Sequence, residues 1–176
     1  MCIKIVFLLL LFSASLFGQS NTLDLILPVK TYHFDRSDLA KYDFGEGGNL
    51  GAIVSLISHR KTFDNIYSTG IFKNSYGKYS LMASYGKKLD LNQKLSVGLN
   101  IGIATNYKDA YHSFDRKGNR LEEKGRFYKL FKPLYNISSI PFGGGFCTYE
   151  LSSTLGTILT VNPVYANLAI FIKLKK

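Results

Sequence analysis

The segment LSVGLNIGIAT, residues 95–105, decides the fold because its side chains alternate in size and polarity with a period of two. Large apolar residues occupy one face and small or polar residues the other: Leu95, Val97, Leu99, Ile101 and Ile103 against Ser96, Gly98, Asn100, Gly102 and Ala104. This alternation is typical of a β-strand whose two faces meet different surroundings. No comparable stretch shows the 3.6-residue period of a helix.

The same period of two recurs along the chain. It predicts eight strands, at about 24–33, 49–58, 64–73, 78–88, 94–106, 133–140, 150–161 and 164–174. Most of these segments exceed the roughly five or six residues of an average soluble strand, and they match the about 9 to 11 that a tilted membrane strand needs. We therefore expect an all-β fold, an eight-stranded antiparallel up-and-down transmembrane β-barrel with a narrow interior. A soluble lipocalin-like barrel has the same strand count and is the alternative.

The N-terminus indicates export. Lys4 precedes an apolar run, IVFLLLLF at 5–12, and the small residues of SASLFG follow at 13–18. This is the pattern of a secretory signal peptide, and its apolar run is too short to span a bilayer. We expect residues 1–18 to be removed and residues 19–176 to form the barrel domain in the outer membrane. An uncleaved N-terminal anchor is the alternative.

Charge and composition limit the partners. The net charge is +10, and the segment RKGNRLEEKGRFYKLFK at 116–132 carries seven Lys or Arg against two Glu. Within a predicted extracellular loop at 107–132, this excess favours lipid phosphate over nucleic acid, which an exported protein seldom meets. A solvated loop without a partner is the alternative. The short turns are expected at Asp90-Leu91-Asn92 and Asn162-Pro163.

No metal or cofactor is expected, because the three histidines are scattered along the chain, at His33, His59 and His112. Cys2 belongs to the signal peptide, so Cys147 would have no disulfide partner in the mature chain. We expect a monomer.

Three polar residues stand at the ends of predicted strands and are candidates for catalysis. His33 closes the first strand, and Asn74 and Ser75 follow the third. Strand ends alternate between the two rims of an up-and-down barrel, so the first and third strands end at the same rim. A Ser and a His at one rim could form a nucleophilic pair, although a Ser in a turn more often bonds only to the backbone.

The segment GIFKNSYGKYSLMASYG, residues 70–86, resembles the segment that carries the catalytic Asp-Ser pair in the outer-membrane lipid A palmitoyltransferases. Thr31-Tyr32-His33 has the form of that family's first-loop histidine, and looser matches follow at Gly45–Gly51, Leu95–Gly102 and Pro133-Leu134. The resemblance implies a barrel whose interior holds one acyl chain. It also implies transfer of a palmitoyl group from a phospholipid to the lipid A of lipopolysaccharide at the extracellular mouth.

The resemblance places His33 and Ser75 at two of the family's three catalytic positions, and Asn74 where the family has Asp. An amide cannot stabilise a protonated His as a carboxylate does, although it could polarise a developing oxyanion. A carboxylate for His33 would then have to come from Asp35, Asp38 or Asp64. The sequence leaves two hypotheses: a lipid-processing acyltransferase, with His33 as general base, and a non-catalytic outer-membrane barrel that keeps the scaffold.

Overall fold

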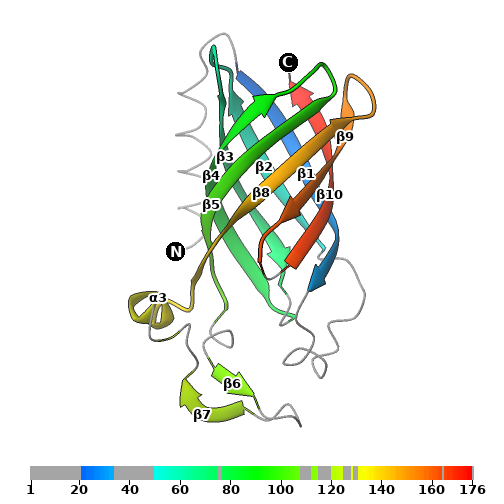
Figure 1. The fold of residues 1–176 in the computed structure, drawn as a ribbon. Coiled ribbons are helices and arrows are strands. Elements are labelled where there is room, and N and C mark those ends of the chain that lie inside the picture. The colour runs from blue at the N-terminus through cyan, green and yellow to red at the C-terminus, as the bar shows by residue number, and fades with distance from the viewer. Residues whose placement is uncertain are drawn as a thin grey trace.

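The computed structural model describes residues 21–33, 50–74, 77–107, 112–114, 120–124, 128, 131–163 and 165–175. Eight strands form one closed barrel (Figure 1). They are β1 (Asn21–His33), β2 (Gly51–Ser58), β3 (Asp64–Lys73), β4 (Tyr79–Asp90), β5 (Leu95–Ala104), β8 (Ile140–Glu150), β9 (Leu155–Val161) and β10 (Tyr165–Lys175). Each strand pairs antiparallel with its neighbour in this order, and β10 pairs with β1 to close the ring. The predicted all-β up-and-down barrel is confirmed.

The sixth barrel strand was predicted in the wrong place. The residues expected to form it, 133–140, instead form the short helix α3 (Lys132–Asn136), and the strand β8 begins only at Ile140. Pro133 lies in the first turn of α3, where its missing N–H costs nothing. The Pro133-Leu134 strand entry suggested by the resemblance is therefore wrong. The next strand was also predicted too long, because residues 151–154 form the turn before β9.

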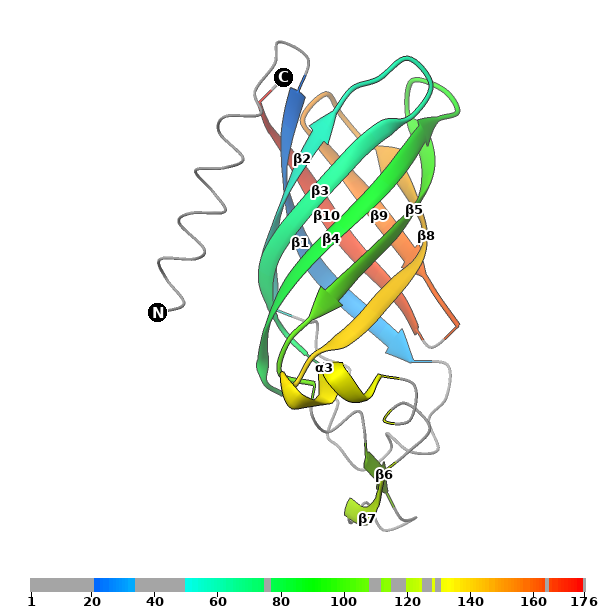
Figure 2. The ribbon, with the colours of Figure 1, turned by 90° about the vertical axis from the view of Figure 1, so that its left-hand side faces the viewer.

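The segment 107–132 holds structure of its own. β6 (His112–Phe114) and β7 (Arg120–Lys124) pair antiparallel in a separate two-stranded sheet. Figure 2 shows this sheet and α3 at one end of the barrel, with α3 beside the ends of the strands and the β6–β7 sheet beyond them. The described parts of the long connection predicted at 107–132 therefore lie at one rim of the barrel. The two-stranded sheet of β6 and β7 is part of this connection.

The two faces of the barrel wall have opposite character. On β5, Leu99 and Ile101 are 69% and 67% exposed on the outside, whereas Ser96 is only 5% exposed on the inside. The other strands add Ile71, Leu81, Leu159, Leu168 and Ile170 to the exposed apolar surface. A soluble barrel of the lipocalin type needs a largely polar outer surface, which differs from the apolar outer surface seen here.

Glycines and phenylalanines share the interior in cross-strand pairs. Gly98 pairs with Phe146 and Gly156 with Phe171, and each aromatic ring lies where a side chain on the glycine would have to go. A narrow eight-stranded barrel has room for one large side chain at each of these levels, so its partner must be small.

The two rims differ in their connections. At the short-turn rim, β1 begins, β10 ends, and residues 59–63, 91–94 and 151–154 join neighbouring strands. At the opposite rim, which we call the long-loop rim, β1, β3, β5 and β9 end, and the chain returns through 34–50, 74–78, 105–139 and 162–164. Both predicted short turns are present, one at each rim.

Within the described residues, no helix has the length and apolar character needed to cross a membrane.

Candidate functional site at the long-loop rim

The ends of β1 and β3 place two of the sequence candidates at one rim. β1 ends at His33 and β3 at Lys73, and both strands run toward the long-loop rim, because β2 lies antiparallel between them. The prediction of a shared rim is therefore confirmed for the strand ends that carry His33 and Asn74. Ser75 and the side chain of His33 lie outside the described residues.

Asn74 organises the turn that follows β3. Its backbone N–H donates to the carbonyl oxygen of Lys78 at 2.8 Å, and its side-chain Oδ1 accepts from the N–H of Lys78 at 3.0 Å. Gly77 donates its N–H to the carbonyl of Asn74 at 2.9 Å and has a φ of 70°, a conformation that glycine adopts without strain. These hydrogen bonds of Asn74, together with the positive φ of Gly77, fix the path of the chain from β3 into β4.

The amide nitrogen of Asn74 is also occupied. Asn74 is only 3% exposed, and its Nδ2 donates to Oγ of Ser80 at 2.8 Å and to the carbonyl oxygen of Asn106 at 2.9 Å. Both amide hydrogens are thereby used to join the turn to β4 and to the segment after β5. This arrangement supports a structural task for Asn74. A catalytic role as an oxyanion donor would require one of these bonds to break.

Of the three candidate carboxylate partners for His33, Asp64 alone belongs to the described residues. Asp64 opens β3 at the short-turn rim, at the other end of the barrel from His33, and it is bonded there to His59 and Lys88. Asp64 is therefore excluded as a partner of His33. Asp35 and Asp38 lie outside the described residues.

A cavity of about 390 Å³ occupies the lumen. Its apolar middle is lined by residues from most strands, including Ile26, Ile53, Met82, Phe146, Ile158 and Phe171. Its lining reaches the strand ends of the short-turn rim at Thr22, His59, Asp90 and Glu150, and in the other direction it includes Thr160 and Asn167. The volume lies within the roughly 300 to 1,000 Å³ of small-molecule pockets.

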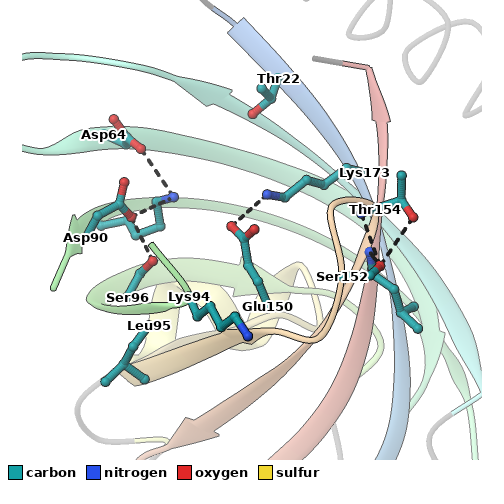
Figure 3. A network of polar contacts seen from close by, with 12 residues as sticks. Thr22, Asp64, Asp90, Lys94, Leu95, Ser96, Glu150, Ser152, Thr154 and Lys173 are labelled. Carbon is teal, nitrogen blue, oxygen red and sulfur yellow. Dashed lines mark hydrogen bonds and ion pairs between the residues drawn. The ribbon is translucent and has the colours of Figure 1, made fainter. Parts of the chain in front are cut away.

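Charged side chains gather inside the barrel at the short-turn rim, in a group that we call the inner polar cluster: Thr22, Asp24, His59, Asp64, Lys88, Asp90, Ser96, Glu150 and Lys173. Lys88 bridges Asp64 at 3.3 Å and Asp90 at 3.0 Å. Lys173 on β10 forms an ion pair with Glu150 on β8 at 2.6 Å (Figure 3). His59 bonds Asp64 at 3.0 Å and Thr22 at 3.2 Å, and Ser96 donates to Asp90 at 2.7 Å.

This cluster was not predicted from the sequence, although several of its residues follow the period of two. On β4, Ser84, Gly86, Lys88 and Asp90 follow one another on the small and polar face. Asp24 and Lys173 likewise stand among residues that line the lumen. Charged residues in phase with the inner face of several strands, near the same rim, were the available signal.

In the part of the chain that the structure describes, no group of three or more His, Cys, Asp or Glu side chains is placed to hold a metal ion. Cys147 is a free thiol on β8. No protein-family model matches the chain, and a search of curated proteins found no match either.

Proposed function

We propose that this chain is an outer-membrane β-barrel that processes lipids. The observation that supports membrane insertion is the apolar outer surface of the barrel, where Leu99 and Ile101 are each more than two-thirds exposed, whereas Ser96 on the inner face is buried. An apolar surface that encircles a barrel is stable in hydrocarbon and costly in water. The two long connections then lie on the extracellular side, at the rim of His33 and Asn74.

The lipid-processing step that we propose is acyl transfer at the long-loop rim. An ester bond of a phospholipid breaks, and its acyl group forms a new ester with a hydroxyl of lipid A. His33 accepts the proton of the attacking hydroxyl and returns it to the released lysophospholipid, and Ser75 polarises the reacting ester. Support comes from the resemblance of the two segments and from the shared rim of their strands. The apolar middle of the lumen, at Ile53, Met82 and Phe146, suits an acyl chain.

Mass spectrometry of lipid A from cells with and without the protein tests this proposal. We expect one added acyl chain with the wild type and none with Ser75→Ala or His33→Ala. Ser153→Ala, in an exposed turn at the opposite rim, is the matched control and should retain the activity. An acyl chain that is still added by the double variant Ser75→Ala/His33→Ala would exclude catalysis by these residues.

A non-catalytic barrel is the second candidate, and the bonds of Asn74 favour it. If both amide hydrogens of Asn74 serve the turn, the segment around Ser75 is kept for folding. Lipid A would then be unchanged even when the wild-type protein is shown to be folded in the outer membrane. Heat-modifiable migration of the membrane fraction on a gel would establish that folding independently.

A further inference from the structure

Asp24 carries a buried acceptor that the inner polar cluster does not satisfy. Its side chain lines the lumen cavity, the residue is only 6% exposed, and its Oδ1 has no hydrogen-bond partner among the described residues. A buried carboxylate oxygen without a donor is costly, and in native proteins it normally meets a ligand, an ion or water. This atom is the starting point for a binding site.

The neighbouring lysines are already engaged. Lys88 is shared between Asp64 and Asp90, and Lys173 pairs with Glu150 at 2.6 Å. The cluster contains four carboxylates (Asp24, Asp64, Asp90 and Glu150) against two ammonium groups (Lys88 and Lys173), which leaves an excess of two negative charges when His59 is neutral. Arg60, Lys61 and Lys94 in the turns of the same rim lie outside this count, so the negative excess belongs to the side chains of the cluster and not to the rim as a whole.

The surroundings of Asp24 define what kind of cation would fit. A divalent metal ion requires several oxygen ligands together, and the described residues offer no such group. Ile26, Ile57 and Phe171 line the same cavity, so a ligand in contact with Asp24 also meets apolar surface. A second unpartnered acceptor, Oδ1 of Asn100, lines the cavity on β5, across the strand ring from β1. Unsatisfied acceptors with apolar walls suit a ligand that has N–H donors and a hydrocarbon part.

We propose that the short-turn half of the lumen binds a primary alkylammonium group, with its N–H donating to Oδ1 of Asp24 and its alkyl part against Ile26, Ile57 and Phe171. The cation enters between the strand ends of the short-turn rim, where His59 and Asp90 are exposed. This site lies at the other end of the barrel from His33 and Asn74 and does not depend on acyl transfer. A free alkylamine and the head group of an ethanolamine phospholipid share the required chemistry.

Calorimetric titration of the refolded full chain in phosphocholine micelles with n-butylammonium chloride tests the site. Saturable binding is expected, and equal concentrations of potassium chloride or tetramethylammonium chloride, which lack N–H donors, should not reproduce it. Asp24→Asn should weaken the affinity roughly tenfold or more, because a charge-assisted hydrogen bond is lost. The neighbouring variant Leu23→Ala should leave the affinity unchanged. Equal binding by Asp24→Asn, or equal binding of tetramethylammonium, would overturn the proposal.

Methyl NMR of the wild type tests the site without any variant that could fail to fold. Addition of butylammonium should shift the methyl signals of Ile26 and Ile57 inside the lumen and leave Ile71 and Ile101 on the outer face unchanged. Shifts confined to the outer-face residues would show partition into the micelle and would also overturn the site.

Bilayer discs distinguish the two sources of the ammonium group. If discs of phosphatidylethanolamine weaken butylammonium binding relative to discs of phosphatidylcholine, the lipid head group is the natural occupant. If the affinity is the same in both, the site takes a free amine. Absence of saturable binding in both kinds of disc would refute the proposal.

Discussion

Phe146 on β8 lies over Gly98 on β5, its directly paired residue, so that the aromatic ring fills the space that a side chain at position 98 would need. Gly145 directly precedes Phe146 on β8, and a Cβ added there would have its nearest atoms only at 3.9 Å. Gly98 is therefore required by the space that Phe146 occupies, whereas no neighbouring atom prevents a larger residue at Gly145.

Gly98→Ala should destabilise the barrel by about 1–3 kcal/mol, because the added methyl group would overlap both the ring of Phe146 and the backbone carbonyl of Lys87. Gly145→Ala should change the stability by no more than about 1 kcal/mol, and in the stabilising direction, because a strand glycine loses more entropy on folding than alanine. Urea unfolding of both variants in lipid vesicles measures the difference. Equal losses for the two substitutions would contradict the close contact.

The same residues show why the sequence predicted part of the wall and missed the rest. The alternation of 95–105 predicted β5 and its two faces, because both faces carry distinct side chains. β8, IPFGGGFCTYE, was missed because three consecutive glycines weaken both the alternation and the strand propensity. What keeps all three glycines in a strand is pairing with β5, to which Gly145 adds pairing with β9, and no local pattern contains these pairings.

The candidate site was predictable to a similar extent. Topology alone placed the ends carrying His33 and Asn74 at one rim, because antiparallel order requires it. The bonds from Asn74 to Ser80 and Asn106 were not predictable, since they join residues that are 6 and 32 positions apart through the folded turn.

Asn74→Ala should destabilise the barrel by about 2–3 kcal/mol, because the buried hydroxyl of Ser80 and the part-buried carbonyl of Asn106 lose their donor. Asn74→Asp keeps the acceptor for the N–H of Lys78 but turns a carboxylate oxygen toward the Asn106 carbonyl, so it should also be less stable than the wild type. Asn92→Ala, in an exposed turn at the other rim, is the control and should cost less, about 1 kcal/mol.

Asn74→Asp also separates the two functional hypotheses. If the site is catalytic in the manner that the resemblance implies, the restored carboxylate should increase acyl transfer per folded molecule. If Asn74 serves only the turn, this variant loses stability and gains no activity. Lipid A mass spectra, normalised to the folded fraction on a heat-modifiability gel, distinguish these results.

Lys88→Met tests the inner polar cluster. Removal of Lys88 leaves Asp64, which is 8% exposed at its side chain, without its lysine partner, whereas Asp90 can turn to water. We expect a loss of about 2–3 kcal/mol, below the full cost of a buried unpaired charge, because one of the two carboxylates is exposed. Lys87→Met, on the outer face of the same strand, should not destabilise the protein. Urea unfolding in vesicles measures both variants, and similar midpoints would show that the cluster contributes little to stability.

Leu99→Arg tests whether the apolar outer surface of the barrel faces lipid. Leu99 is the most exposed apolar residue of β5, near the middle of the wall, so an arginine there meets hydrocarbon if the barrel spans a bilayer. The expected loss of stability in phospholipid vesicles is then about 2–4 kcal/mol, compared with about 0–1 for Leu91→Arg in the short turn after β4, since the cost falls from the bilayer midplane to its interfaces. A barrel in water would tolerate both substitutions equally, because Leu91 and Leu99 are each more than half exposed. Unfolding free energies that are the same for the two arginine variants would therefore exclude a lipid-facing β5.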